Sequence, residues 1–285
     1  MKILILGADG MLGHVVTTYL TEKGHEVVKT SRDPNDNYYF DAYENVYSIE
    51  GIIARVHPDA IINCIGILNE AAEKHHALAI LLNSFLPNYL DELAKKYEFT
   101  LVHVTTDCVF DGENGDYTED AVPNATSFYG ISKAMGEVKS DRALTLRLSI
   151  VGPDINPNGI GLFNWFSKQS GEVKGYSKVF WTGVTTVELA RVIEEGLKEK
   201  ITGFHHVVNN EKIAKSELIR LFEKYFHFGI TVVDDDTKKS DKSLIRTNKS
   251  HDFKIPSYEQ MVKDMRAWVD AHPDLYTDLK ERMDK

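Results

Sequence analysis

A tyrosine and a lysine that stand four residues apart, Tyr129 and Lys133, could carry out proton transfer. If this segment is a helix, both side chains lie on one face of it. A free tyrosine has a pKa of about 10 and exchanges protons poorly at neutral pH, whereas a nearby ammonium favours the phenolate and lowers that pKa. The pair therefore predicts proton transfer to or from a carbonyl or hydroxyl oxygen.

Thr106 offers a hydroxyl group for the same chemistry. It follows the apolar run at 101–104, which has the composition of a buried strand. Ligands of open α/β sheets bind beyond the carboxyl ends of the strands, so Thr106 stands where a substrate oxygen could be held. Threonine at a strand end is also an ordinary turn residue, and this position alone does not separate the two interpretations.

A glycine-rich turn lies between a strand pattern at 2–6 and a helix pattern at 12–23. In G-x-x-G-x-x-G the first glycine permits a tight turn, the second lets the backbone approach a pyrophosphate, and the third lets the helix pack closely on the sheet. Free amides at the start of the helix then face the phosphates. We therefore predict a dinucleotide site formed by Gly7, Gly10, Met11, Leu12 and Gly13.

The end of the second predicted strand, at 26–30, favours one cofactor over another. It continues into Ser31 and Arg32, without the acidic residue that would bind a ribose 2′-hydroxyl. A guanidinium is a better partner for a 2′-phosphate, because it is permanently charged and can donate two N–H groups at once. We therefore expect NADPH, with NADH as an alternative because Asp33 is adjacent to Arg32.

The elements that must position these residues follow an alternating order. Short apolar runs rich in β-branched residues alternate with helical patterns, which is typical of a parallel sheet covered on both faces. Right-handed crossovers then give a doubly wound α/β fold of the Rossmann type, here with a smaller C-terminal region. We expect strands at 2–6, 26–30, 59–65, 100–104 and 144–150, and helices at 12–23 and 78–96.

The composition changes after Gly152, where loop residues and aromatics follow. We therefore predict a dinucleotide-binding domain at 1–152 and a mainly substrate-binding region at 153–285. The charged run at 234–242 is expected to be a solvated loop. Three amphipathic helices are expected in this region, at 187–200, 216–226 and 258–271, and the first of them should pack back on the first domain.

Composition also limits the partners of the protein. With 33 Lys and Arg against 43 Asp and Glu, the formal net charge is −10, which does not suit a general nucleic-acid binder and requires a locally positive site for any anionic substrate. Two cysteines and eleven histidines, without metal-ligand spacings, predict neither a disulfide framework nor a metal site. Because no signal-peptide pattern or membrane-spanning apolar run is present, we expect a cytoplasmic protein that binds no membrane.

Two further motifs follow the glycine-rich turn in a distinctive order. They are T-D-C-V-F-D-G at 106–112 and Y-G-I-S-K-A-M-G-E at 129–137. Together with the turn and Asn63, these motifs resemble those of the extended short-chain dehydrogenase/reductases, and within that superfamily the dTDP-4-dehydrorhamnose reductase family. The resemblance is strong over 1–152, looser at 181–186 and faint beyond Gly203.

The resemblance implies roles for individual residues. Thr106 would orient a substrate carbonyl and Tyr129 would donate a proton to it. Lys133 would lower the pKa of the tyrosine and hold the nicotinamide ribose. Asp41 would lie near the adenine, and Gly66 would line the cofactor. The implied reaction is hydride transfer from NADPH to the 4-keto group of a nucleotide-linked 4-keto-6-deoxy sugar, in an enzyme of polysaccharide biosynthesis for which a homodimer is allowed.

The predicted substrate side departs from the family. Cys108 stands where the family has tyrosine, and Ile150 replaces a tryptophan near the sugar, so the sugar-contacting surface has changed. Asn83 resembles an asparagine that supports the site, Trp181 is a candidate for contact with the base or sugar, and Arg246 for contact with the diphosphate. Further candidate cations for the diphosphate are Lys174, Lys178, Lys238 and Lys239.

Three other functions remain open. A 4,6-dehydratase needs an added acid–base pair, for which the neutral thiol of Cys108 is a poor substitute. A nucleotide-sugar epimerase would use the same tyrosine and lysine. A non-catalytic, NADP-binding regulatory subunit is the third, since the regulatory subunit of methionine adenosyltransferase resembles this family.

Overall fold

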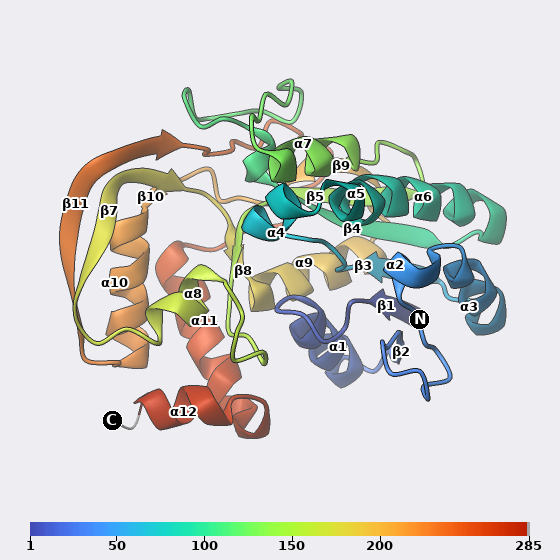
Figure 1. Ribbon diagram of the computed structural model, residues 1–285, viewed down its shortest axis with the longest axis horizontal. Coiled ribbons are helices and arrows are strands. Elements are labelled where there is room, and N and C mark those ends of the chain that lie inside the picture. Colours follow the sequence, from blue (N-terminus) through green and yellow to red (C-terminus); the bar gives the residue numbers. More distant parts are fainter. Residues whose placement is uncertain (284–285) are drawn as a thin grey trace.

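The computed structural model describes residues 1–283, which form two lobes (Figure 1). The first lobe is built on a six-stranded sheet in the order β2-β1-β3-β4-β5-β9, with every neighbouring pair parallel. This confirms the predicted doubly wound α/β fold. The strands are β1 (Lys2–Leu6), β2 (Glu26–Lys29), β3 (Ala60–Asn63), β4 (Thr100–Thr106), β5 (Ala143–Leu148) and β9 (Gly203–His206).

Alternation along the strands divides the core of this lobe into two layers. On β1, Ile3 and Ile5 face one cluster, whereas Leu4 and Leu6 face the other, as the period of two in a strand requires. Burial on both faces explains the nearly continuous apolar runs. Helices α1 (Gly13–Glu22) and α9 (Thr186–Lys198) cover the first face, and α3 (Ser48–Val56) and α6 (Leu86–Tyr97) cover the second.

The second lobe contains a three-stranded sheet in the order β10-β7-β11. The prediction of a loop at 234–242 is wrong, because residues 234–241 lie in β11, which pairs in parallel with β7. Its charged side chains are mostly exposed along an edge strand, where charge discourages pairing with other chains. The elements are α8 (Leu162–Phe166), β7 (Gly171–Trp181), β10 (Ile213–Ala214), α10 (Lys215–Phe226), β11 (Ile230–Asp241), α11 (Tyr258–Ala271) and α12 (Thr277–Met283).

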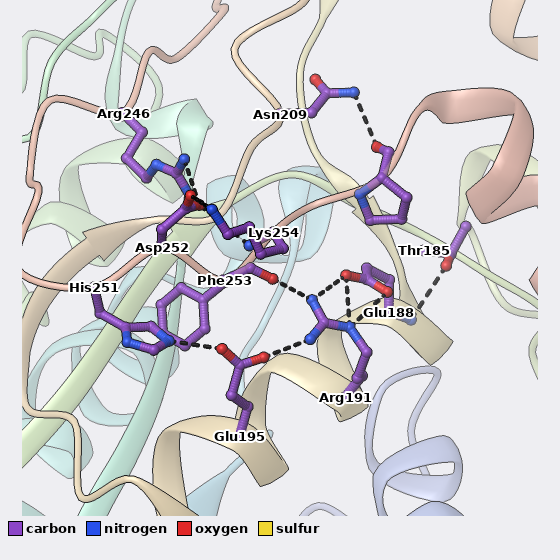
Figure 2. A network of polar contacts seen from close by, with 11 residues as sticks. Thr185, Glu188, Arg191, Glu195, Asn209, Arg246, His251, Asp252, Phe253 and Lys254 are labelled. Atoms are coloured by element: carbon purple, nitrogen blue, oxygen red, sulfur yellow. Dashed lines mark hydrogen bonds and ion pairs between the residues drawn. The ribbon is translucent and has the colours of Figure 1, made fainter.

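The chain returns to the first lobe after residue 185. Helix α9 packs on α1, and β9 extends the parallel sheet beside β5, so these residues belong to the first lobe although they follow residue 152. Arg191 ties α9 to the segment that leads into α11: it binds Glu188 and Glu195 and donates to the carbonyl oxygen of Phe253 (Figure 2).

The long helix expected at 78–96 is interrupted. Helix α5 (His76–Ala79) is followed by a wider π-helical turn, Ile80–Phe85, before α6 begins. Short strands β6 (Ile150–Val151) and β8 (Val184–Thr185) pair where the two lobes meet. No helix within residues 1–283 is both long and apolar enough to cross a lipid bilayer.

Candidate active site

A cleft of about 690 Å³ lies at the carboxyl ends of β1, β3, β4 and β5. The glycine-rich turn and the loop at Gly66 line one part of it, and Thr106, Tyr129 and Lys133 line another. The second lobe adds Trp181 and other side chains to the same cleft. The structure thus brings together residues that are more than a hundred positions apart, at the edge where parallel sheets bind ligands.

Thr106 ends β4 and caps the short turn that follows. Its hydroxyl accepts a hydrogen bond from the backbone amide of Cys108 at 3.1 Å and donates to the Asp107 carboxylate at 3.2 Å. Tyr129 lines the same cleft as Thr106. Thr106 thus lies at the end of β4 in the lining of the cleft, and its role toward a substrate oxygen stays a prediction.

Helix α7 (Phe128–Met135) carries both Tyr129 and Lys133. The Ser127 hydroxyl accepts from the amide of Gly130 at 3.1 Å and fixes the start of the helix. A Cβ at Gly130 would lie 2.2 Å from the Cys108 carbonyl oxygen, so only glycine allows α7 to pack this closely against the turn after β4.

Burial shifts the two side chains of the pair in opposite directions. It raises the pKa of Tyr129, with the Cys108 and Asp107 side chains adding to the shift, so the phenol keeps its proton at neutral pH. Burial lowers the pKa of Lys133 to about 8, and its ammonium donates to the carbonyl oxygen of Val104 at 2.9 Å. The net shift of the Tyr129 pKa in this structure is upward, and the effect of Lys133 on the tyrosine stays a prediction.

The glycine-rich turn fits a dinucleotide pyrophosphate. Gly7 has a φ of +76°, and a Cβ at Gly13 would lie 2.0 Å from the Gly7 carbonyl oxygen, so both positions require glycine. Within residues 1–283 the amides of Met11 and Leu12 have no protein acceptor, and both residues line the cleft. Free amides at a helix start are the donors that phosphate oxygens need.

Asn83 supports the cleft from behind and does not line it. It lies in the π-helical turn, where its side chain accepts from the Ile67 amide at 3.0 Å and donates to the Ile67 carbonyl at 2.9 Å. It also donates to the Ser132 hydroxyl at 3.0 Å. Asn83 therefore connects α7 to the loop that begins at Gly66, and its contribution to substrate binding stays a prediction.

Three residues predicted to select or hold the cofactor lie outside the lining of the cleft. Arg32 is exposed just beyond β2. The Ser31 hydroxyl accepts from the amide of Asp33 at 3.0 Å. Asp41 caps the short helix α2 (Ala42–Asn45) by accepting from the amide of Tyr43 at 2.8 Å. Their roles toward a cofactor stay predictions.

On the predicted substrate side, Ile150 and Trp181 line the cleft, whereas Arg246 does not. The Arg246 guanidinium pairs with Asp252 at 2.7 Å, beside the polar network of α9 (Figure 2). Sequence reasoning missed Lys215, the first residue of α10, which lines the cleft and makes no ion pair within residues 1–283. The signal in the sequence was a lysine directly before the helix expected at 216–226.

Neither cysteine is suited to act as a nucleophile. Burial raises the pKa of both Cys64 and Cys108 to about 12, so each remains a thiol at neutral pH. Cys108 packs beside Tyr129 and Phe128 in a small apolar cluster next to the cleft. Its place after Thr106 therefore shapes the cleft without adding a reactive group.

Comparisons with known proteins agree with this geometry. The RmlD substrate binding domain family matches residues 1–273. The probable low-salt glycan biosynthesis reductase Agl14 of Haloferax volcanii is 34% identical over 163 residues, 53% of this chain and 54% of that protein. Methionine adenosyltransferase 2 subunit beta of Xenopus tropicalis is 28% identical over 233 residues, 76% of this chain and 70% of that protein.

Similar architecture is found among solved structures. The dTDP-4-dehydrorhamnose reductase of Bacillus anthracis, solved in complex with NADP, aligns with a TM-score of 0.80 at 20% identity, over 94% of this chain and 99% of that one. Since the family match covers nearly the whole chain, the predicted resemblance is confirmed. The chain belongs to the RmlD substrate binding domain family, a dTDP-4-dehydrorhamnose reductase-like branch of the extended short-chain dehydrogenase/reductase superfamily.

Proposed function

We propose that this protein is an NADPH-dependent reductase that acts on the 4-keto group of a nucleotide-linked 4-keto-6-deoxy sugar. One observation carries the proposal: the glycine-rich turn lines the same cleft as Thr106, Tyr129 and Lys133. Family membership supports it, as does the NADP bound to the Bacillus anthracis relative.

The free amides of Met11 and Leu12 would hold the cofactor pyrophosphate, and Lys133 the nicotinamide end. When bound, the cofactor supplies a hydride. Tyr129 would donate a hydrogen bond to the carbonyl oxygen and stabilise the charge that grows there. Thr106 would do the same once its hydroxyl proton turns from Asp107 to the substrate. The raised pKa of Tyr129 keeps the phenol protonated until that charge appears, and the phenol then transfers its proton to the oxygen.

Lys215 is the residue proposed to meet the substrate diphosphate. It is the cation that the second lobe contributes to the cleft, and it offsets the repulsion of an anionic substrate by a chain of net charge −10. Trp181, buried at the end of β7, offers an apolar face to the same cleft. Arg246 is not proposed for this role because Asp252 already pairs with it.

The test is consumption of NADPH, followed by its absorbance, with a panel of nucleotide-linked 4-keto sugars. Tyr129→Phe should bind NADPH with nearly unchanged affinity and lose at least roughly a hundredfold in turnover, because the proton donor is missing. Wild-type turnover of one panel member with this loss in the variant would support the proposal. Full turnover by Tyr129→Phe would exclude the tyrosine as proton donor.

A second candidate function is a cofactor-binding subunit that has no turnover of its own. The similarity to methionine adenosyltransferase 2 subunit beta favours it, since that match covers 76% of this chain against 53% for Agl14. Retained NADPH binding with no consumption across the whole panel would favour this candidate. The intact set of Thr106, Tyr129 and Lys133 favours the reductase.

A further inference from the structure

Side chains from the two ends of the chain meet beneath the glycine-rich turn. His14, in the first turn of α1, has Nδ1 2.9 Å from the Gly10 carbonyl oxygen and Nε2 2.8 Å from the Tyr276 hydroxyl. The Trp268 indole of α11 donates to the same hydroxyl oxygen at 2.9 Å. All three side chains are buried, with exposed fractions of 5% for His14, 2% for Tyr276 and 8% for Trp268.

The chemistry of these groups fixes the direction of each hydrogen bond. A carbonyl oxygen only accepts, so Nδ1 of His14 must carry a proton. Burial lowers the pKa of His14 and keeps its ring neutral, which leaves Nε2 as an acceptor that takes the Tyr276 O–H. An indole N–H only donates, so Trp268 donates to the phenol oxygen. The chain of bonds runs from Trp268 through Tyr276 and His14 to Gly10.

The end of this chain bears on the phosphate site. In a trans peptide the carbonyl of Gly10 and the amide of Met11 point in opposite directions. A carbonyl held on His14, beneath the turn, therefore aims the Met11 amide toward the cleft, where it lacks a protein acceptor. The backbone amide of His14 makes a second bond to the same carbonyl at 3.1 Å, so loss of the chain would loosen this peptide without freeing it.

We infer that Tyr276 and His14 are positioning residues for the cofactor, through which the C-terminal segment sets the orientation of the pyrophosphate-binding peptide. Tyr276 and Trp268 do not line the cleft, so they act without touching the cofactor. The inference rests on the proposed binding of NADP(H). Because coupling between two sites is reciprocal, cofactor bound at the turn must in return affect the Trp268 indole.

The test is Tyr276→Phe, which removes one oxygen atom and leaves the indole N–H of Trp268 and Nε2 of His14 each without a partner. The dissociation constant for NADP⁺, measured by titration calorimetry, should rise roughly tenfold, as expected for unpaired buried groups. With NADPH saturating, kcat and the KM for the sugar should not change. The indole N–H resonance of Trp268, assigned with Trp268→Phe, should move on addition of NADP⁺ in the wild type and stay in place in Tyr276→Phe.

Leu279→Ala is the matched control. Leu279 is buried on α12, three residues after Tyr276, and belongs to the core without joining the chain of bonds. This variant should lose stability and keep its NADP⁺ affinity. If Tyr276→Phe and Leu279→Ala weakened NADP⁺ binding equally, the effect would come from a general loss of stability, and the inference would be overturned. An unchanged NADP⁺ affinity in Tyr276→Phe would also overturn it. A wild type that binds no NADP(H) would instead remove the proposed function.

Discussion

Tyr129 and Lys133 lie one helical turn apart on α7. Their burial shifts the pKa of each side chain before any ligand binds. The phenol of Tyr129 keeps its proton at neutral pH because burial raises its pKa. The ammonium of Lys133 has a pKa of about 8 because burial disfavours its charge. The sequence alone predicted the opposite shift for the tyrosine. Spacing identifies neighbours on a helix, but the Val104 carbonyl that accepts from Lys133 comes from a distant strand.

Lys215 gives the sharpest test of the substrate side at the level of one residue. Lys215→Met keeps the length of the side chain and removes its charge, so the KM for the nucleotide sugar should rise roughly tenfold, as for a lost hydrogen bond to a charged group. The dissociation constant for NADPH should not change. Steady-state kinetics and cofactor titration measure the two effects.

Lys212→Met is the matched control for this prediction. Lys212 is three residues away and binds Asp116 and Asp241, outside the lining of the cleft. Its substitution should leave the KM for the sugar unchanged. If Lys212→Met raised that KM as much as Lys215→Met, the effect would reflect overall charge, and a specific diphosphate contact would be contradicted.

Arg32 tests the choice between the two nicotinamide cofactors. If the exposed guanidinium beyond β2 meets a 2′-phosphate, Arg32→Ala should weaken NADPH binding roughly tenfold or more and change NADH binding little. The NADH titration is the internal control, since both cofactors share the rest of the site. Equal losses for the two cofactors would contradict the preference for NADPH.

At the level of elements, the sequence predicted what local patterns encode. Buried strands such as β4 were predicted because their apolar runs are continuous, and α11 because its apolar residues recur at helical spacing. The π-helical turn was missed, since the apolar pattern runs on through Asn83 and only the bonds to Ile67 and Ser132 show why that residue turns inward. Strand β11 was missed because its charges resemble a solvated run, and its pairing with β7 is distant in sequence.

The π-helical turn therefore offers its own test. Asn83→Ala breaks three hydrogen bonds at a fully buried position, which should lower the free energy of unfolding by about 2–4 kcal/mol. It should also lower kcat, because α7 and the loop at Gly66 lose their connection. Urea unfolding and turnover at saturating substrate measure both.

Asn88→Ala is the matched control, because Asn88 lies in α6, directly after the π-helical turn. Asn88 is exposed and donates to the carbonyl oxygens of Ser84 and Met135. Its loss should cost less than about 1 kcal/mol and leave kcat unchanged. A normal kcat in folded Asn83→Ala would show that the turn serves stability alone.

Across the whole molecule, histidines are buried where the elements join. His103 lies in β4, His205 and His206 lie in β9, and His14 lies beneath the glycine-rich turn. Burial lowers the pKa of each, to about 4 for His206 and well below the usual value for His103. In the unfolded chain each would titrate near pH 6.5.

These shifts predict how stability depends on pH. Below about pH 6.5 the unfolded chain binds protons that the folded chain excludes. The free energy of unfolding therefore rises with pH in this range and stops rising above about pH 7.5. As pH falls toward 5, each such histidine should remove up to about 1.4 kcal/mol per pH unit. Urea unfolding at a series of pH values measures this slope. His206→Asn should reduce the slope by up to about 1.4 kcal/mol per pH unit, which is the contribution of one proton. If the free energy of unfolding stayed constant between about pH 5 and 7, the folded chain would bind as many protons as the unfolded chain. The lowered pKa values of these histidines would then be contradicted.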